Sequence, residues 1–412
     1  MGQGVVIVGA SLGGLRLAEQ LRAAGFAGVI SIIGAERHMP YNRPPLSKAT
    51  LLQSSAELAA IADAAGALPG LTFSLRPSVA GVIWHLGVPA VKTDLADRTV
   101  TLADGRVLSY EALGIATGLS PRRLSQSGGE SDRHILRTID DAVRLGRALK
   151  PGVRVAVIGG GFIGCEVAAT ARQRGCDVTV IEPLPQPMCR AIGLELAGAI
   201  RSYHEAQGVT FRLGVSVTGI NHKAGAPDRL SDITLSDGAT IAADVLVEAI
   251  GSICNVDWLS GNGLDLTDGV LTDNAMRVER RADVVAVGDV ARFPNPRYGG
   301  DARRVEHWAI PALTARRAAA TIAATLLGHE PDERGFDPLP TFWSDQFDIR
   351  LQSIGIPALG DTSAVLEGNL ADLGRAGAPG VAMGYWRDER LIGVITIGLP
   401  AARMSDYRTQ LS

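Results

Sequence analysis

Two stretches of the chain share one pattern of apolar and small residues. Residues 4–19, "GVVIVGASLGGLRLAE", and 153–168, "VRVAVIGGGFIGCEVA", each run from an apolar strand through a glycine-rich turn into a helix. Such a turn builds an anion site at the helix N-terminus, which suits the pyrophosphate of a dinucleotide. The copies lie 150 residues apart, from Gly9 to Gly159, and predict two dinucleotide sites.

The hydrophobic periodicity around these turns predicts the neighbouring elements. In the first copy Leu12, Leu15, Ala18 and Leu21 share one helix face, and Gly25 follows as the C-cap. The strands "VISII" and "DVTVIE" follow the two helices. Each half also carries a predicted β-hairpin, because "RTVTLADGRVLSY" and "ITLSDGATIAADVLVEAIG" alternate around an Asp-Gly pair.

The pattern changes towards the end of the chain. "DVVAVGDV" predicts another buried strand, and a helix is expected from about Pro311 to Leu327. From Gly328 onwards the short alternating strands "TFWSDQF", "IRLQSIG", "GVAMGYW" and "LIGVITIG" predict a separate α+β domain. The predicted fold class is therefore α/β, with two Rossmann-like dinucleotide-binding domains and a C-terminal α+β domain. The expected domains are 1–115 with 250–327, 116–249, and 328–412.

Composition narrows the function classes. A chain of 412 residues suits two or three domains, and its formal net charge of -3 does not favour nucleic acid or an anionic membrane as a partner. Charged residues and glycines interrupt every apolar stretch before the roughly 18 to 20 residues that a membrane-spanning helix needs. A strand starts almost directly after Met1, where a secretory leader would carry its charged and apolar regions. We expect a soluble, cytoplasmic protein.

The four cysteines are Cys165, Cys176, Cys189 and Cys254. They are widely spaced and form no C-x-x-C pair, so the sequence predicts neither a disulfide framework nor a zinc site. We expect them to be small buried residues, and we predict no metal site.

The second glycine turn has the complete dinucleotide fingerprint. Gly159, Gly161 and Gly164 have the G-x-G-x-x-G spacing, and Glu182 ends the next strand 23 residues after the first of them. A carboxylate at that place accepts hydrogen bonds from a ribose diol and repels a 2′-phosphate, which favours NADH over NADPH.

The first glycine turn is less regular. It has Gly9, Ser11 and Gly14, with a serine where the middle glycine is usual. Serine is small enough to leave the backbone accessible to a pyrophosphate. Glu36, 27 residues after Gly9, follows the next strand and is the expected ribose acceptor.

Further motifs give the chain a family resemblance. "YNRPPLSK" at 41–48, "ATG" at 116–118, "AVGD" at 286–289, "RVEHW" at 304–308 and "WSDQ" at 343–346 accompany the two glycine turns. Together they resemble the FAD-dependent NADH:ferredoxin reductases of bacterial cytochrome P450 and Rieske oxygenase systems, which have a glutathione-reductase-like fold. The resemblance runs essentially from end to end and implies FAD in the first dinucleotide domain and NADH in the second.

The resemblance also implies which residues contact each cofactor. Those assigned to FAD are Gly9, Ser11, Gly14, Glu36, Arg43, Lys48, Ala90, Ala116, Thr117, Gly118, Arg137, Asp289, Val305 and Trp308. Those assigned to NADH are Gly159, Gly161, Ile163, Gly164, Glu182, Arg190 and Gly251.

Two cofactors suit the chemistry that this family carries out. NADH gives up a hydride, which is received at flavin N5, whereas a 2Fe-2S ferredoxin takes one electron at a time. We expect Lys48 and Glu166 to be the catalytic pair beside N5, with their ion pair placing a positive charge near the reduced ring. The alternatives are a solvated loop lysine for Lys48 and, for Glu166, a carboxylate favoured by the helix dipole.

Arginines gather in the segment that follows "AVGD". Residues 290–320 contain six arginines against Asp301 and Glu306, an excess of +4. This patch is the expected docking surface for an acidic ferredoxin, and an ordinarily solvated surface is the alternative. The six are Arg292, Arg297, Arg303, Arg304, Arg316 and Arg317.

Two other residues have open interpretations. Trp343 of "WSDQ" lies either near the flavin or in the core of the C-terminal domain. Glu248 interrupts the apolar run "VLVEAIG" and is either a solvent-facing strand end or a carboxylate near the nicotinamide.

Two other classes of protein share the predicted fold. A disulfide reductase or a thiol-based NADH oxidase needs a redox cysteine, and "RHMPYNRPPLSKATLLQ" after Glu36 contains none. A signalling flavoprotein that resembles apoptosis-inducing factor uses the same domains to bind partners. An NADH oxidase or a redox-sensing flavoprotein with another acceptor is therefore the alternative function.

Overall fold

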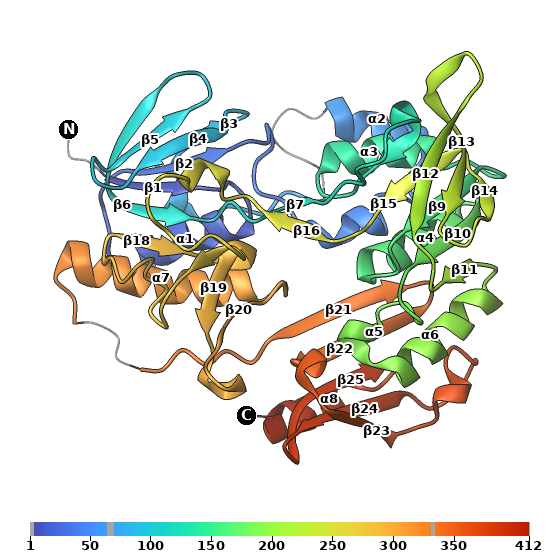
Figure 1. Cartoon of the computed structure of the whole chain (residues 1–412). Coiled ribbons are helices and arrows are strands. Elements are labelled where there is room, and N and C mark those ends of the chain that lie inside the picture. The colour runs from blue at the N-terminus through green and yellow to red at the C-terminus, as the bar shows by residue number, and fades with distance from the viewer. Residues whose placement is uncertain (1–3, 64–69, 331–333, 412) are drawn as a thin grey trace. The chain divides into compact units, whose positions relative to one another are not determined.

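The computed structural model describes residues 4–63, 70–330 and 334–411, which form two compact units. Figure 1 traces the chain through them by colour. The described parts of Met1–Asn42, Ala64–Ser120 and Ile253–Pro340 make up unit 1, and those of Arg43–Asp63, Pro121–Ser252 and Thr341–Ser412 make up unit 2. The finer division into three domains stays a prediction.

Unit 1 is built on a sheet whose centre consists of the predicted apolar strands. Strand β1 (Gly4–Val8) pairs in parallel with β2 (Ile30–Gly34) on one side and with β6 (Val107–Ile115) on the other. Parallel pairing continues to β3 (Ile83–Leu86) and β18 (Val284–Ala286). Because β1, β18 and most of β2 are buried, they read as nearly continuous apolar runs, whereas β3 at the edge is exposed or partly buried. An antiparallel arm is added by β5 (Thr99–Leu102) and β4 (Ala90–Asp94).

Two helices of unit 1 pack against each other. Helix α1 (Leu12–Ala23) buries Leu15, Leu17 and Leu21 completely, and Gly25 follows its C-cap in a left-handed conformation (φ +92°). Helix α7 (Ile310–Leu327) has a proline in its first turn and left-handed Gly328 as its cap. Both helices match the predicted boundaries within one residue. Within the described residues no helix is long and apolar enough to cross a membrane.

Unit 1 also contains three short strands near its end. They form a small sheet of β17 (Val270–Leu271), β19 (Ala291–Pro294) and β20 (Ala302–Arg304).

Unit 2 repeats the parallel plan of unit 1. Its sheet has the order β11 (Thr210–Leu213), β10 (Asp177–Glu182), β9 (Arg154–Ile158), β15 (Val245–Glu248) and β8 (Arg133–His134), and every pair in it is parallel. Its helices include α2 (Ser55–Asp63), α3 (Ile139–Ala148), α4 (Phe162–Gln173), α5 (Cys189–Ile192) and α6 (Leu194–Ala206).

Each predicted hairpin is present. In unit 1, β5 and β6 turn at Gly105 (φ +87°), and in unit 2, β13 (Ala226–Leu235) and β14 (Thr240–Ala242) turn at Gly238 (φ +81°). Both glycines have the left-handed conformation that an Asp-Gly turn needs. Strand β12 (Val217–Lys223) completes the sheet of the second hairpin.

The C-terminal segment forms an antiparallel sheet followed by α8 (Ala401–Leu411). Four of its strands are those predicted from the sequence. The strand order is β21 (Thr341–Gln346), β22 (Ile349–Gly355), β25 (Arg390–Ile397), β24 (Val381–Arg387) and β23 (Thr362–Glu367). The edge strand β23 was not predicted, because all but its last residue are exposed and it has no buried alternation.

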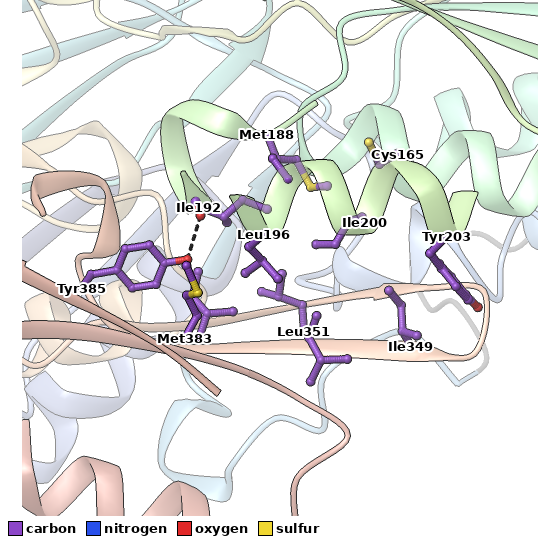
Figure 2. Packing of buried hydrophobic residues seen from close by; sticks show 13 residues of the cluster. Cys165, Met188, Ile192, Leu196, Ile200, Tyr203, Ile349, Leu351, Met383 and Tyr385 are labelled. Carbon is purple, nitrogen blue, oxygen red and sulfur yellow. Dashed lines mark hydrogen bonds between the residues drawn. The ribbon is translucent and has the colours of Figure 1, made fainter. Parts of the chain in front are cut away.

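This sheet shares a hydrophobic core with the helices of unit 2. Leu196 and Ile200 of α6 pack over Leu351 and Met383 of the sheet, as Figure 2 shows. Beside them the Tyr385 hydroxyl donates to the backbone oxygen of Ile192 at 2.7 Å. Burial of each such side chain contributes about 1.5 to 3 kcal/mol. The C-terminal sheet is therefore anchored on α5 and α6, and β21 also contacts α4.

Candidate dinucleotide and redox sites

The glycines of the first turn are required by close backbone packing. A Cβ atom on Gly9 would lie 2.0 Å from the Ala116 backbone oxygen, and one on Gly14 would lie 2.0 Å from the Gly9 backbone oxygen. Gly9 also has a left-handed backbone (φ +123°). The turn consequently brings β1 directly into α1. Because α1 has no acidic residue in its first turn, the positive end of its dipole stays available to an anion.

Several predicted FAD residues lie together at one edge of the unit 1 sheet. Gly9, Ala116 and the Asp289 turn follow the carboxyl ends of β1, β6 and β18, whose last residues are paired in register. Glu36 lies beyond the end of the adjacent β2, where the Tyr41 hydroxyl donates to its Oε2 at 2.5 Å. Thr117 donates from Oγ1 to the Asn255 backbone oxygen at 2.7 Å. This edge is where open α/β sheets bind their ligands.

Other predicted FAD residues lie elsewhere. Ala90 begins β4 in the antiparallel arm of unit 1. Val305 is buried, and the Trp308 side chain is 43% exposed in the segment before α7. Arg43 and Arg137 belong to unit 2, where the Arg43 guanidinium donates to the Arg137 backbone oxygen at 2.6 Å. The FAD contacts of all these residues stay predictions.

In the second turn, packing requires glycine at some positions, but at Gly161 there is room for a larger side chain. A Cβ atom on Gly164 would lie 2.0 Å from the Gly159 backbone oxygen, so packing of α4 on the strand demands glycine. At Gly161 a Cβ atom would meet nothing within 4 Å, and its φ of -73° suits any residue. The protein's own packing therefore gives no reason for glycine there. A bare backbone before a helix N-terminus fits the close approach of a pyrophosphate.

The remaining predicted NADH residues surround this turn. Glu182 ends β10 and is 7% exposed; its Oε2 accepts from the Gly160 backbone N–H at 2.7 Å and its Oε1 from that of Leu184 at 2.9 Å. The carboxylate thus braces the glycine turn, a role that the sequence did not predict. Ile163 is 48% exposed in the first turn of α4, and Arg190 is exposed on α5. Gly251 has a left-handed backbone with open space around it.

Lys48 and Glu166 form an ion pair inside unit 2. Lys48 Nζ lies 2.7 Å from Glu166 Oε2, and the Lys48 side chain is 19% exposed. Glu166 is 6% exposed in the second turn of α4 and pairs with Lys48, so a carboxylate of the N-terminal turn that is favoured by the helix dipole is the wrong interpretation. The hydroxyl of Ser47 donates to Oε2 and that of Ser344 to Oε1, each at 2.6 Å. The place of this pair beside flavin N5 stays a prediction.

Sequence reasoning missed both serines. The signal was present, because Ser47 belongs to "RPPLSK" and Ser344 to "WSDQ". In β21 the polar Ser344 and Gln346 are the buried residues, while Trp343 is only partly buried and carries the Arg350 guanidinium 5.6 Å from its ring centre. Polar residues at the buried positions of a strand are a mark of an internal hydrogen-bond network.

Of the two interpretations of Glu248, the solvent-facing one is wrong, and the other, a carboxylate near the nicotinamide, stays a prediction. Glu248 is 2% exposed, which contradicts a solvent-facing strand end. Arg133 donates from Nε to its Oε1 at 2.7 Å, and Arg123 donates from Nε to its Oε2 at 2.9 Å. The backbone N–H of Leu124 also donates to Oε2 at 3.0 Å. The side chain therefore holds the 123–133 segment to the end of β15 as part of a buried charge cluster.

The arginine-rich segment is less positive than its sequence indicates. Carboxylates from outside residues 290–320 pair with three of its arginines: Asp265 with Arg292, Asp337 with Arg297 and Asp268 with Arg304. Arg303 pairs with Asp301, and Arg304 also pairs with Glu306. Six arginines against these five carboxylates leave an excess of +1 instead of +4. Arg316 is exposed on α7 and has no ion pair within the described residues.

The cysteines offer no disulfide chemistry. All four are free, and Cys165 and Cys176 are buried while Cys189 and Cys254 are partly buried. Burial raises the pKa of the Cys165, Cys176 and Cys254 thiols, which disfavours the reactive thiolate. Across the described part of the chain no group of three or more His, Cys, Asp or Glu side chains is arranged to hold a metal ion.

Two glycine turns at the carboxyl edges of parallel sheets, followed by a C-terminal antiparallel sheet, define an oxidoreductase that uses FAD and NAD(H). The chain belongs to the pyridine nucleotide-disulphide oxidoreductase family, whose model matches residues 3–313. The reductase C-terminal model matches residues 341–409.

Named relatives cover nearly the whole chain. The ferredoxin–NAD(+) reductase component of the anthranilate 1,2-dioxygenase system of Burkholderia cepacia is 36% identical over 96% of this chain and 90% of that protein. Putidaredoxin reductase of Pseudomonas putida is 32% identical over 96% of this chain and 89% of that protein. The crystal structure of the covalent putidaredoxin reductase–putidaredoxin complex matches with a TM-score of 0.87 and 29% identity, over 100% of this chain and 93% of that chain.

Proposed function

We propose that this protein passes electrons from NADH through FAD to a 2Fe-2S ferredoxin that serves a cytochrome P450 or Rieske oxygenase, and that it does so in the cytoplasm. Relatives that match over 96% of the chain include the ferredoxin–NAD(+) reductase component of a dioxygenase system and putidaredoxin reductase, and also two rubredoxin–NAD(+) reductases. Within the family, one observation favours electron transfer to an external acceptor over disulfide chemistry. The two nucleotide turns are present, whereas every cysteine is free and three of the thiols have raised pKa values.

FAD would supply the redox chemistry, because a flavin can accept a hydride from NADH and give up its electrons one at a time. The protein supplies position and electrostatics. In this proposal the glycine turns before α1 and α4 bind the two pyrophosphates. Glu36 and Glu182 accept hydrogen bonds from the hydroxyls of the adenosine riboses. Lys48, held by Glu166, presents its ammonium group to the reduced ring. A cation fixed before the reaction stabilises developing negative charge without reorganisation.

Anaerobic stopped-flow absorbance tests the proposal as a whole. We expect NADH to bleach the flavin of the purified protein rapidly, and a 2Fe-2S ferredoxin added next to be reduced while the flavin colour returns. Bleaching followed by rapid reoxidation in air, with no reduction of the ferredoxin, would assign the protein to the NADH oxidases or redox sensors instead. Absence of flavin would overturn the assignment of the first glycine turn.

The docking surface for the ferredoxin is proposed to centre on α7. Of the six predicted arginines, Arg316 is exposed without an ion pair to a described residue, and it lines a surface pocket with Arg317 and Arg334. Four of the other five, Arg292, Arg297, Arg303 and Arg304, are paired with carboxylates. A cation that is not neutralised within its own protein steers an acidic partner most effectively.

Replacing Arg316 tests this surface. We expect Arg316→Gln to raise the KM for an acidic ferredoxin about 3- to 10-fold at low salt and to weaken the salt dependence of that KM. The NADH-dependent bleaching rate should not change. Arg147→Gln, which removes an equal charge from the exposed face of α3, is the control. Equal KM values for the two variants would exclude Arg316 from docking.

A further inference from the structure

The buried face of β21 carries a continuous polar path to Glu166. Ser344 and Gln346 are 1% and 2% exposed, and they alternate with the less buried Trp343 and Asp345. A strand that covers helices normally turns apolar residues inwards. These two polar side chains satisfy each other, because the Gln346 amide nitrogen donates to Ser344 Oγ at 3.0 Å. The Ser344 hydroxyl then donates to Glu166 Oε1 at 2.6 Å.

The far end of this path is His204, in the last turn of α6. Its Nε2 lies 2.7 Å from the Gln346 Oε1 atom. Because the Gln346 nitrogen already donates to Ser344 and contacts the Met188 sulfur, its oxygen needs a donor, which makes His204 the Nε2–H tautomer. His204 is fully buried among the rings of Phe347 and Phe211, and burial lowers its pKa to about 4. The imidazole is neutral at pH 7.

All hydrogen bonds of this path point in one direction. His204 donates to Gln346, Gln346 donates to Ser344, and Ser344 donates to Glu166. The other carboxylate oxygen of Glu166 accepts a hydrogen bond from the Ser47 hydroxyl and forms the ion pair with the Lys48 ammonium. Bonds aligned in this way polarise one another and are strengthened inside a protein. The three donors from β21 and the 47–48 segment fix the orientation of the carboxylate from both of its sides.

We propose that Ser344 and Gln346, fixed by His204, are positioning residues for Glu166 and, through it, for Lys48. The inference rests on the proposed function, in which the Lys48 ammonium acts beside the flavin. Without the Ser344 hydroxyl, Glu166 Oε1 loses its donor and the carboxylate can rotate towards other groups. Lys48 is affected in turn, since its ammonium lies 2.7 Å from Glu166 Oε2, closer than the 3.2 Å of its hydrogen bonds to the Pro44 backbone oxygen and to Ser47 Oγ. The C-terminal sheet thereby contributes to electron transfer through its buried face.

The test compares two buried serines of the same sheet. Ser344 donates to Glu166, whereas Ser353 of β22 is also 1% exposed and its hydroxyl has no partner within the described residues. We expect Ser344→Ala to make the flavin reduction potential more negative and to slow bleaching by NADH about 10-fold. Ser353→Ala should change neither quantity. Ser344→Thr, which keeps the hydroxyl, should restore most of the rate.

Two further measurements separate positioning from general damage. In the double variant Ser344→Ala/Lys48→Met, bleaching should be no slower than in Lys48→Met alone, because both changes act on one ammonium. The ¹⁵N spectrum of the histidines should show a neutral Nε2–H imidazole down to pH 5 that is absent in His204→Phe and shifts in Gln346→Leu. This second readout needs neither cofactor nor activity.

Three results would overturn the inference. The reduction potential of Ser344→Ala could equal that of Ser353→Ala, or the double variant could bleach more slowly than Lys48→Met by the factor that Ser344→Ala shows alone. The third result is an Nδ1–H tautomer at His204. Failure of the proposed function is seen separately, as lack of ferredoxin reduction by the unaltered protein. The reduction potential can be measured by titration with dithionite, without NADH or ferredoxin. The variants can therefore be compared whichever acceptor the protein uses.

Discussion

Lys48→Met is expected to slow reduction of the flavin by NADH about 10²-fold, the loss typical of removing one fixed electrostatic donor from an active site. The ammonium lies 2.7 Å from a carboxylate that is 6% exposed, in surroundings where charge interactions are strong. Methionine keeps the length of the side chain but removes its charge. The rate of anaerobic bleaching at saturating NADH measures the effect, with the flavin content of each preparation determined first.

Lys150→Met is the matched control for this variant. It removes the same charge from unit 2 at an exposed position, and it should leave the bleaching rate unchanged. Loss of bound FAD in Lys48→Met would show that the residue chiefly holds the cofactor. A normal rate with normal flavin content would exclude Lys48 from the reaction and would return it to the class of solvated loop lysines.

Features coded by neighbouring residues could be predicted from the sequence. The glycines at 9, 14, 159 and 164 are dictated by a strand, a turn and a helix that follow one another directly, so local spacing is sufficient. Both Asp-Gly hairpins and four C-terminal strands follow from alternation within single segments. Glu36 and Glu182 were singled out by their positions, beyond the end of β2 and at the end of β10, and their contacts with the riboses stay predictions.

The remote partners of buried charges could not be predicted in this way. The three groups that hold Glu166 come from the 47–48 segment and from β21, and Ser344 is 178 residues away in the sequence. Motif resemblance singled out Lys48, and its place on the helix after the second glycine turn singled out Glu166. Neither gave a reason for the inward-facing polar residues of "WSDQ". Those become intelligible only when β21 is seen to pack on α4 and α6.

Counting charges in a sequence window fails for a related reason. The +4 excess in residues 290–320 ignores Asp265, Asp268 and Asp337, which the fold brings to the arginines from either side of the window. Surface pairs contribute little to stability, yet they remove net charge from the field that a partner meets. A docking surface should therefore be predicted from the charges that remain after ion pairs within the protein are counted. In unit 1 this criterion favours Arg316.

Glu248→Ala is expected to lower the free energy of unfolding by about 3 kcal/mol, because it removes the buried counter-ion of a buried guanidinium and leaves it only the 60% exposed carboxylate of Glu130. The Arg133 side chain is 3% exposed, and its Nε donates to Glu248. Glu248→Gln keeps an acceptor for that group and should cost less. Chemical denaturation, followed by circular dichroism on flavin-loaded protein, measures the difference.

Asp244→Ala provides the comparison for this loss of stability on the same strand. Asp244 precedes β15 and pairs with Arg154 at 2.7 Å, but the two side chains are 33% and 46% exposed, so the pair should contribute only about 0 to 1 kcal/mol. Combining Glu248→Met with Arg133→Met removes both buried charges and should recover much of the stability. If Glu248→Gln instead kept full stability and lost hydride transfer, the carboxylate would belong to the nicotinamide site and the structural assignment would be wrong.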